Sequence, residues 1–299
     1  MRLPRRLLLG GGLLFGAWIA AVNVGAAYFT RRRAPDSPDS PANYGIGFQE
    51  IAFASRDRTR LFGRWIPANN PVGTVILCHG QEGSMDGLTP IMVPLYEAGF
   101  NVLMFDFRAH GRSEGRYVSM GVFEKEDLLG AIDYLYQAYG IASVGVLGFS
   151  MGAATALVAA ALSDHIRAVV ADSSFVDLQK TVQRWGMQRG VAPMIARRVA
   201  QSVLIVASMR MEGRLDQTDP LHWMPHIGPR PILLIYGGDD PYVTRAEMSQ
   251  IESLAEGPVE TWIVDGVGHR GVYRADPIEY TDRVVAWFRT YLALADSPS

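Results

Sequence analysis

Six short apolar runs constrain the fold of this chain more than any other feature of its sequence. They are separated mostly by helix-length segments, including residues 123–139 and 153–162. The runs cover residues 74–78, 102–105, 144–147, 166–171, 232–236 and 259–264. Strands that are apolar throughout are buried on both faces, so this alternation predicts an α/β fold with a mostly parallel sheet covered on both sides. In such sheets, the residues that carry chemistry gather at the carboxyl ends of the strands.

Two other segments complete the predicted domain. Residues 46–54 and 60–66 alternate apolar and polar side chains across a polar turn, which predicts an antiparallel hairpin with one solvated face. Residues 175–229 interrupt the alternation of strand and helix with a long insertion that carries apolar stretches and two tryptophans. We therefore expect one globular domain over residues 44–299, with an insertion at about 175–229.

The N-terminal segment has the pattern of a membrane anchor. Residues 7–29 are apolar and uncharged, and at 1.5 Å per residue they are long enough to cross a hydrocarbon core of about 30 Å. A cleavable signal peptide has a shorter apolar core and is not expected to end in three arginines, so residues 1–33 favour a retained single-pass anchor over a removed signal. The arginines are nearly balanced across the segment and do not set its orientation. Residues 34–43 repeat Pro, Asp and Ser, which predicts a stiff, solvated linker.

Charge and cysteine content exclude several classes of function. Six of the 28 basic residues lie in the first 33 positions, so the rest of the chain carries 22 basic against 30 acidic side chains. An acidic body lacks the basic surface that a nucleic-acid partner needs. Cys78 is the only cysteine, which excludes an internal disulfide framework and a thiolate metal cluster. H-E-x-x-H is absent too, and no cofactor is indicated.

A serine at a tight turn is the strongest candidate for a nucleophile. The sequence G-F-S-M-G at 148–152 directly follows an apolar run and leads into an alanine-rich segment, which predicts a strand, a sharp turn and a helix with Ser150 at the turn. A second match, G-R-S-E-G at 111–115, is separated from the preceding strand and is not followed at once by a helical pattern. The context therefore favours Ser150 over Ser113.

A serine hydroxyl needs a base to take its proton, and that base needs an acid to hold its tautomer. His269 follows the run 259–264 through a short glycine-containing loop and is the best placed of the six histidines. Two adjacent carboxylates, Asp239 and Asp240, follow the run 232–236, and both are candidates for the acid. Asp172 is a third, although a role in bracing the turn after its strand suits it better.

A tetrahedral intermediate needs two donors aimed at its oxyanion. The backbone N–H of Met151 lies directly after the candidate nucleophile, at the N-terminus of a predicted helix whose dipole favours an anion. The second donor is expected in the loop at residues 79–84, where the N–H of Gln81 is the best candidate. The alternative is that this loop is only a glycine-rich turn from strand to helix.

Read together, five ordered motifs resemble those of the α/β-hydrolase superfamily, most nearly its membrane-anchored Bem46-like or serine aminopeptidase S33-like members. The motifs are H-G-Q-E-G-S at 79–84, D-F-R-A-H-G-R-S at 106–113, G-F-S-M-G at 148–152, G-G-D-D-P-Y-V at 237–243 and G-H at 268–269. The resemblance implies the α/β-hydrolase fold, Asp240 as the acid, a structural loop at 111–115 and a lid formed by the insertion. The chain departs from it at Ala109, where relatives usually carry glycine.

These patterns predict a serine hydrolase that cleaves an ester, thioester or amide bond of a small-molecule acyl substrate. The expected set is Ser150, His269 and Asp240, with the Gln81 and Met151 amides as the oxyanion hole. An anchor and an apolar lid suggest lipid-derived acyl groups, although the anchor could equally serve only for location. The alternative is a non-catalytic binding or scaffolding protein that keeps the hydrolase fold.

Overall fold

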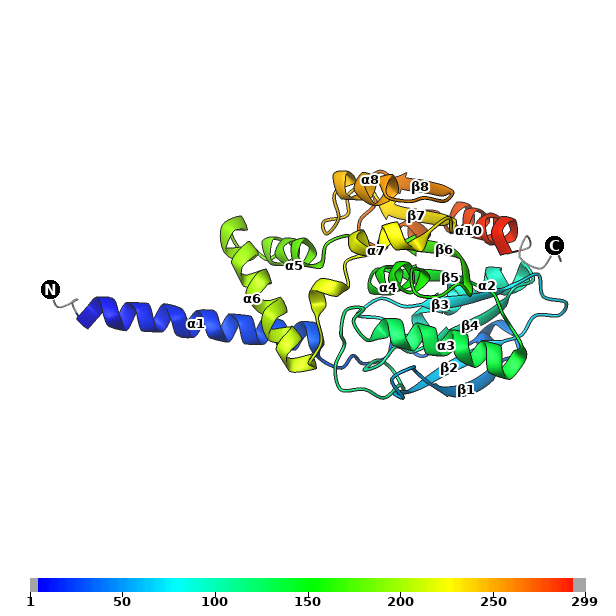
Figure 1. Ribbon diagram of the computed structural model, residues 1–299, viewed down its shortest axis with the longest axis horizontal. Helices are drawn as coiled ribbons and strands as arrows, with labels where there is room; N and C mark the ends of the chain where they lie inside the picture. The colour runs from blue at the N-terminus through cyan, green and yellow to red at the C-terminus, as the bar shows by residue number, and fades with distance from the viewer. Residues whose placement is uncertain (1–4, 293–299) are drawn as a thin grey trace.

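The computed structural model describes residues 5–292, with the side chains of residues 15–292 other than Asp216. Its centre is an eight-stranded sheet in the order β1-β2-β4-β3-β5-β6-β7-β8 (Figure 1). The strands are β1 Gln49–Ala54, β2 Arg60–Ile66, β3 Thr74–Cys78, β4 Asn101–Phe105, β5 Val144–Phe149, β6 Ile166–Asp172, β7 Ile232–Gly237 and β8 Val259–Val264. β2 pairs antiparallel with β1 and β4, and every later pair is parallel. The predicted fold, a mostly parallel sheet with an antiparallel N-terminal hairpin, is confirmed.

The first hairpin strand is shorter than its alternating pattern predicts. It begins at Gln49, because residues Pro41–Tyr44 before it form a 3-10 turn, η1, which the N–H of Gly45 closes by donating to the carbonyl of Ala42 at 3.1 Å. The N–H of Ile46 then donates to the carbonyl of Pro41 at 3.0 Å instead of joining the sheet. The other predicted strands lie within a residue or two of their observed bounds.

Helices cover both faces of the sheet. α2, α9 and α10 pack on one face and α3, α4, α7 and α8 on the other, each with its own cluster of buried apolar side chains. The helices are α1 Arg5–Thr30, α2 Thr89–Glu97, α3 Glu124–Tyr139, α4 Met151–Ala160, α5 Leu178–Met187, α6 Pro193–Met211, α7 Pro220–Ile227, α8 Arg245–Ser253, α9 Val272–Ala275 and α10 Pro277–Leu292; short 3-10 turns η2 and η3 cover Asp86–Leu88 and Leu215–Gln217. This two-sided cover explains why the central strands read as continuous apolar runs.

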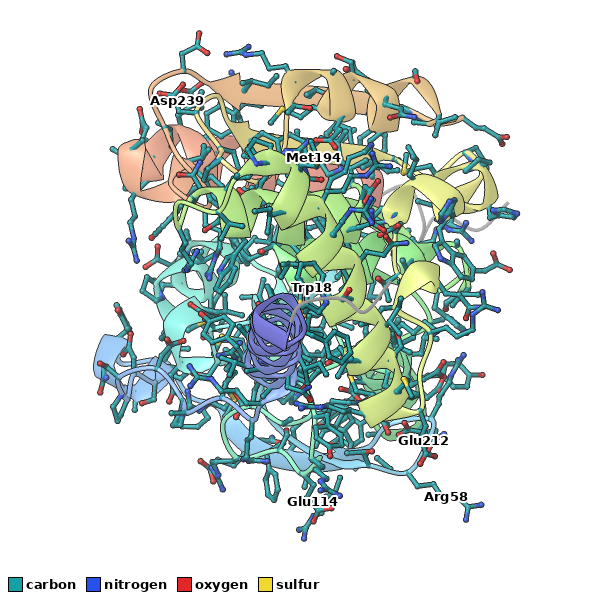
Figure 2. The ribbon with its side chains drawn as sticks, turned by 90° about the vertical axis from the view of Figure 1, so that its left-hand side faces the viewer. Trp18, Arg58, Glu114, Met194, Glu212 and Asp239 are labelled. Atoms are coloured by element: carbon teal, nitrogen blue, oxygen red, sulfur yellow. The ribbon has the colours of Figure 1, made fainter. Side chains whose placement is uncertain are left out.

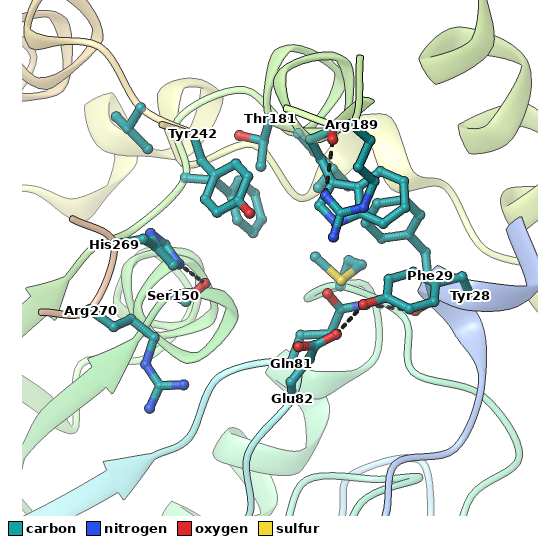
Figure 3. A pocket seen from close by; sticks show the side chains of 15 residues that line it. Tyr28, Phe29, Gln81, Glu82, Ser150, Thr181, Arg189, Tyr242, His269 and Arg270 are labelled. Atoms are coloured by element: carbon teal, nitrogen blue, oxygen red, sulfur yellow. Dashed lines mark hydrogen bonds between the residues drawn. The ribbon is translucent and has the colours of Figure 1, made fainter. Parts of the chain in front are cut away.

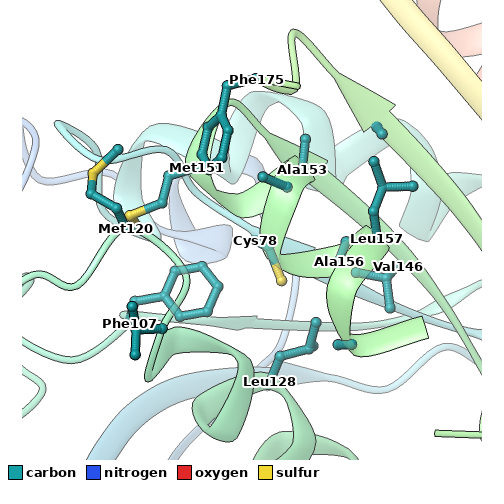
Figure 4. Close-up of a cluster of buried hydrophobic side chains, with 14 of the residues drawn as sticks. Cys78, Phe107, Met120, Leu128, Val146, Met151, Ala153, Ala156, Leu157 and Phe175 are labelled. Atoms are coloured by element: carbon teal, nitrogen blue, oxygen red, sulfur yellow. The ribbon is translucent and has the colours of Figure 1, made fainter. Parts of the chain in front are cut away.

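α4 is the most deeply buried helix among the described residues, since each of its side chains is buried. Figure 4 shows Ala153, Ala156 and Leu157 of this helix beside Cys78 at the end of β3. The cysteine is fully buried and fills space in the core, and burial raises the pKa of its thiol. Small alanine side chains bring α4 close to the sheet, and that closeness positions the turn at its N-terminus.

The insertion between β6 and β7 forms α5, α6, η3 and α7, and α1 packs against α6 (Figure 1). Val22, Ala26 and Phe29 on the C-terminal third of α1 are buried in this contact region, while Phe15 is exposed. Within the range whose side chains are described, no helix is long and apolar enough to span a bilayer. The predicted anchor, residues 7–29, lies within α1, and the side chains of its residues 7–14 are outside the described ones.

The linker predicted at residues 34–43 is attached to the domain rather than free in solvent. Asp36 accepts hydrogen bonds from the backbone N–H of Ser84 at 2.7 Å and from its hydroxyl at 3.2 Å. The hydroxyl of Ser84 in turn accepts from the N–H of Asp36 at 2.9 Å. These reciprocal bonds hold the linker against the loop that follows β3.

Candidate active site

Ser150 occupies the turn between β5 and α4 with a strained backbone. Its φ is +52° and its ψ is −111°, a conformation that a residue with a side chain rarely adopts. A Cβ on Gly148 would lie 2.3 Å from the carbonyl oxygen of Gly152, and a Cβ on Gly152 would lie 2.4 Å from that of Cys78. Both glycines are therefore required by close backbone approach. The turn lifts Ser150 clear of the sheet, where it is partly exposed.

A chain of hydrogen bonds links this serine to a histidine and a carboxylate. His269 Nε2 lies 3.0 Å from the hydroxyl of Ser150, and His269 Nδ1 lies 2.7 Å from Oδ2 of Asp240. The carboxyl group of Asp240 is fully buried, and its Oδ1 accepts from the N–H of Tyr242 at 2.8 Å. A carboxylate held in this way keeps the proton of the imidazole on Nδ1. Nε2 is then free to accept the proton of the serine hydroxyl.

The loop after β3 lies beside the serine. A Cβ on Gly80 would lie 3.4 Å from the Cβ of Ser150, which brings the neighbouring Gln81 to the site. The backbone N–H of Gln81 and that of Met151, the first residue of α4, donate no hydrogen bond to any group in the described range of the chain. The first N–H groups of a helix have no partner within the helix. Both amides are thus available to a ligand oxygen.

Two buried histidines fix the shape of this loop. His79 Nδ1 donates to the carbonyl of Gly80 at 2.8 Å, and its Nε2 accepts from the N–H of Phe107 at 3.0 Å. Burial lowers the pKa of His79 well below its ordinary value, which matches a neutral ring that both donates and accepts. His110 holds the other end of the loop, with Nε2 lying 2.7 Å from the carbonyl oxygen of Gln81.

Comparison with known proteins supports the α/β-hydrolase fold of this chain. A family model described as the alpha/beta hydrolase fold matches residues 73–203. The esterase Pf2001 of Pyrococcus furiosus superposes with a TM-score of 0.73 at 26% identity, over 88% of this chain and 98% of that one. The chain has the α/β-hydrolase fold.

Other proteins are similar to this chain over most of its length. The E. coli K12 protein YfhR, described as uncharacterized, is 27% identical over 253 residues, which is 78% of this chain and 80% of YfhR. The uncharacterized YqkD of Bacillus subtilis 168 is 27% identical over 233 residues, 74% of this chain and 75% of YqkD. An esterase domain from Rhodothermus marinus shares the fold alone, with a TM-score of 0.59 at 20% identity.

The structure distinguishes Asp239 from Asp240, which the sequence left open, and shows the setting of Ser113. Asp239 is exposed, at the margin of the molecule in Figure 2, whereas Asp240 contacts His269. Ser113 is fully buried: its hydroxyl donates to the carbonyl of Asp106 at 2.6 Å and accepts from the N–H of Phe62 at 2.9 Å. Ser113 is thus a structural residue of its loop. Ala109 of the same loop has a φ of +56°, the left-handed region in which glycine is preferred.

Asp172 braces the back of the site. Its carboxylate accepts from the hydroxyl of Ser173 at 2.8 Å and from that of Tyr280 at 3.0 Å, and its carbonyl accepts from the N–H of Ser150 at 2.8 Å. Burial raises the pKa of Asp172, and its effect outweighs that of the two hydrogen bonds, which lower the pKa. In the described part of the chain, no hydrogen bond joins Asp172 to His269. The backbone N–H of Arg270, the residue after that histidine, donates instead to the Ser173 hydroxyl at 3.0 Å.

A cavity of about 190 Å³ opens beside Ser150 and His269. Figure 3 shows these two residues on one side and Tyr28 and Phe29, at the end of α1, on the other; Trp185 of α5 also lines the cavity. Sequence reasoning assigned α1 only to a membrane and missed its part in this cavity. The pair of aromatic residues before three arginines was the only local signal, and it is equally typical of a membrane interface. In the described range, no group of three or more His, Cys, Asp or Glu is placed to hold a metal ion.

Proposed function

We propose that this α/β hydrolase is a serine hydrolase that cleaves an ester, thioester or amide bond through an acyl-enzyme. The observation that carries the proposal is the hydrogen-bonded chain from Ser150 through His269 to Asp240. This chemistry needs three parts: a buried carboxylate that accepts two hydrogen bonds, a histidine held in one tautomer, and a serine on a strained turn.

The reaction proceeds in two halves. The hydroxyl oxygen of Ser150 attacks the acyl carbon while its proton passes to His269 Nε2, and the Gln81 and Met151 amides hold the oxyanion. Collapse of the intermediate breaks the bond to the leaving group, which takes the proton from His269. Water then attacks the acyl-enzyme with His269 as base, which releases the acid and restores the serine.

The cavity supports a substrate with a small acyl group. A closed apolar cavity of about 150 Å³ accepts a ligand of the size of benzene, and drug-sized ligands occupy about 300 Å³ or more. At about 190 Å³, the cavity beside Ser150 suits a short acyl chain. The superposition on an esterase supports esters as the first class to test.

The test is hydrolysis of p-nitrophenyl esters from acetate to dodecanoate, with thioester and anilide analogues, together with labelling by a fluorophosphonate probe. We expect turnover and labelling by the wild type, and loss of both in Ser150→Ala. Ser113→Ala is the matched control, because that serine lies in the same G-x-S-x-G pattern but is buried in its loop. Its labelling should persist. A folded wild type that binds acyl ligands but neither turns over nor labels would instead favour a non-catalytic binding protein.

We also propose that the N-terminal part of α1 attaches the protein to a membrane, as in Bem46-like relatives. The apolar residues 7–21, which precede the buried C-terminal third of α1, and the projection of α1 from the body support this (Figure 1). The protein should sediment with membranes and resist extraction by alkaline carbonate, whereas replacing Leu8 and Leu9 with Asp should release it. Recovery of the wild type in the supernatant would refute the attachment.

A further inference from the structure

We propose that the C-terminal end of α1 is part of the substrate site, where Phe29 and Tyr28 close the acyl cavity and set the length of acyl chain that it accepts. This inference rests on the proposed ester hydrolysis and assigns a specificity role to a helix that the sequence assigned only to a membrane.

The wall of the cavity opposite Ser150 is an aromatic cluster drawn from two helices. The rings of Phe29 and Trp185 have centroids 5.2 Å apart in an edge-to-face arrangement, and those of Tyr28 and Trp185 are 5.1 Å apart. Phe29 is only 6% exposed, so its ring is packed and cannot swing away at little cost. An acyl chain that extends from the serine therefore meets a fixed apolar wall.

The same end of α1 is bonded to the loop that supplies the proposed oxyanion donor. The side-chain amide of Gln81 donates to the carbonyl of Phe29 at 2.9 Å. The hydroxyl of Tyr28 donates to the carboxylate of Glu82, and burial together with this hydrogen bond raises the pKa of Tyr28, so the phenol stays a donor. Arg33 lies 3.8 Å from Glu82 and donates to the carbonyl of Tyr28 at 2.8 Å. The aromatic wall of the cavity and the loop at residues 79–84 therefore hold each other in place.

The register of α1 against the insertion is also fixed. A Cβ on Gly25 would lie 2.8 Å from Cγ2 of Val203, which shows how closely α1 approaches α6. Arg210, near the C-terminal end of α6, donates to the side chain of Asn23 at 3.0 Å. These contacts hold Phe29 at the cavity instead of leaving the helix free to slide. A chain cleaved after residue 29 would lack one wall of its acyl site, which is a physical reason for the segment to be retained.

The experiment compares two phenylalanines of one helix. Phe29→Ala removes the wall, and Phe15→Ala makes the same chemical change at an exposed position, 66% accessible, that does not line the cavity. The full chain is purified in detergent, and kcat/KM is measured for p-nitrophenyl acetate and octanoate. We expect the octanoate-to-acetate ratio of kcat/KM to rise at least about tenfold in Phe29→Ala, because one further methylene accepted by an apolar pocket is worth about that factor, and to stay unchanged in Phe15→Ala.

Phe29→Leu keeps α1 packed if Phe29→Ala fails to fold, and it should shift the ratio in the same direction by a smaller factor. An unchanged ratio in folded Phe29 variants, or an equal shift in Phe15→Ala, would overturn the role of Phe29 while leaving Ser150-dependent hydrolysis intact. If the wild type neither hydrolyses the esters nor labels with the fluorophosphonate, the proposed function and this inference fail together.

Discussion

His269 Nε2 lies 3.0 Å from the hydroxyl oxygen of Ser150, although the two residues are 119 positions apart in the chain. Their proximity follows from strand order, because β5, β6, β7 and β8 run parallel and side by side. The turns after β5, β7 and β8 therefore leave the sheet at one edge. Each turn contributes one member of the hydrogen-bonded chain.

Asp240→Asn should lower kcat by about four orders of magnitude, because an amide holds the imidazole in the wrong tautomer. Asp239→Asn is the matched control at the neighbouring, exposed position and should leave kcat within about twofold, since surface substitutions have small effects. Ester hydrolysis at saturating substrate measures both. Equal losses in the two variants would contradict the assignment of the acid.

Ser150→Gly should be more stable than Ser150→Ala by about 1 kcal/mol, although both variants are inactive. The φ of +52° strains any residue with a Cβ, and glycine alone relieves that strain. Urea unfolding followed by circular dichroism gives the difference in unfolding free energy. A more stable alanine variant would show that the turn is relaxed in solution.

Stability should fall as the pH drops below about 6.5, in part because of His79. Burial depresses its pKa in the folded state, so the unfolded chain takes up a proton that the folded chain does not. The full contribution of the neutral ring to stability is present above the pKa that His79 has in the unfolded chain. Below that pKa, the free energy of unfolding falls by at most about 1.4 kcal/mol for each pH unit. Urea titrations at pH 7.5, 6.5 and 5.5 measure the slope. In His79→Asn, which cannot titrate, the free energy of unfolding should depend less steeply on pH than in the wild type. Equal slopes in the two proteins would show that His79 is not a cause of the pH dependence.

Cys78 should not react with iodoacetamide in the folded protein, because it is fully buried and burial raises the pKa of its thiol. Ester hydrolysis should accordingly survive treatment with the reagent. Alkylation should occur in 6 M guanidinium chloride, as mass spectrometry will report. Rapid labelling under native conditions would show that the core around α4 opens.

Local patterns were sufficient for most of the fold. Runs that are apolar throughout predict buried parallel strands. The two glycines around Ser150 predict a turn at which backbones pass closely. Each of these signals depends on only a few neighbouring residues. The start of β1 was predicted three residues early, since the competing bond from Ile46 to Pro41 depends on how the linker folds back.

By itself, the sequence determined the strand-turn-helix unit that presents Ser150 and the chain order of the serine, acid and histidine candidates. Only the tertiary structure showed that Asp240, and not Asp239, contacts His269, that Ser113 is buried in its loop and that Phe29 lines the cavity. The physical reason is that local signals depend on backbone geometry within a few residues. The partner of a carboxylate and the wall of a cavity depend instead on which distant elements pack together.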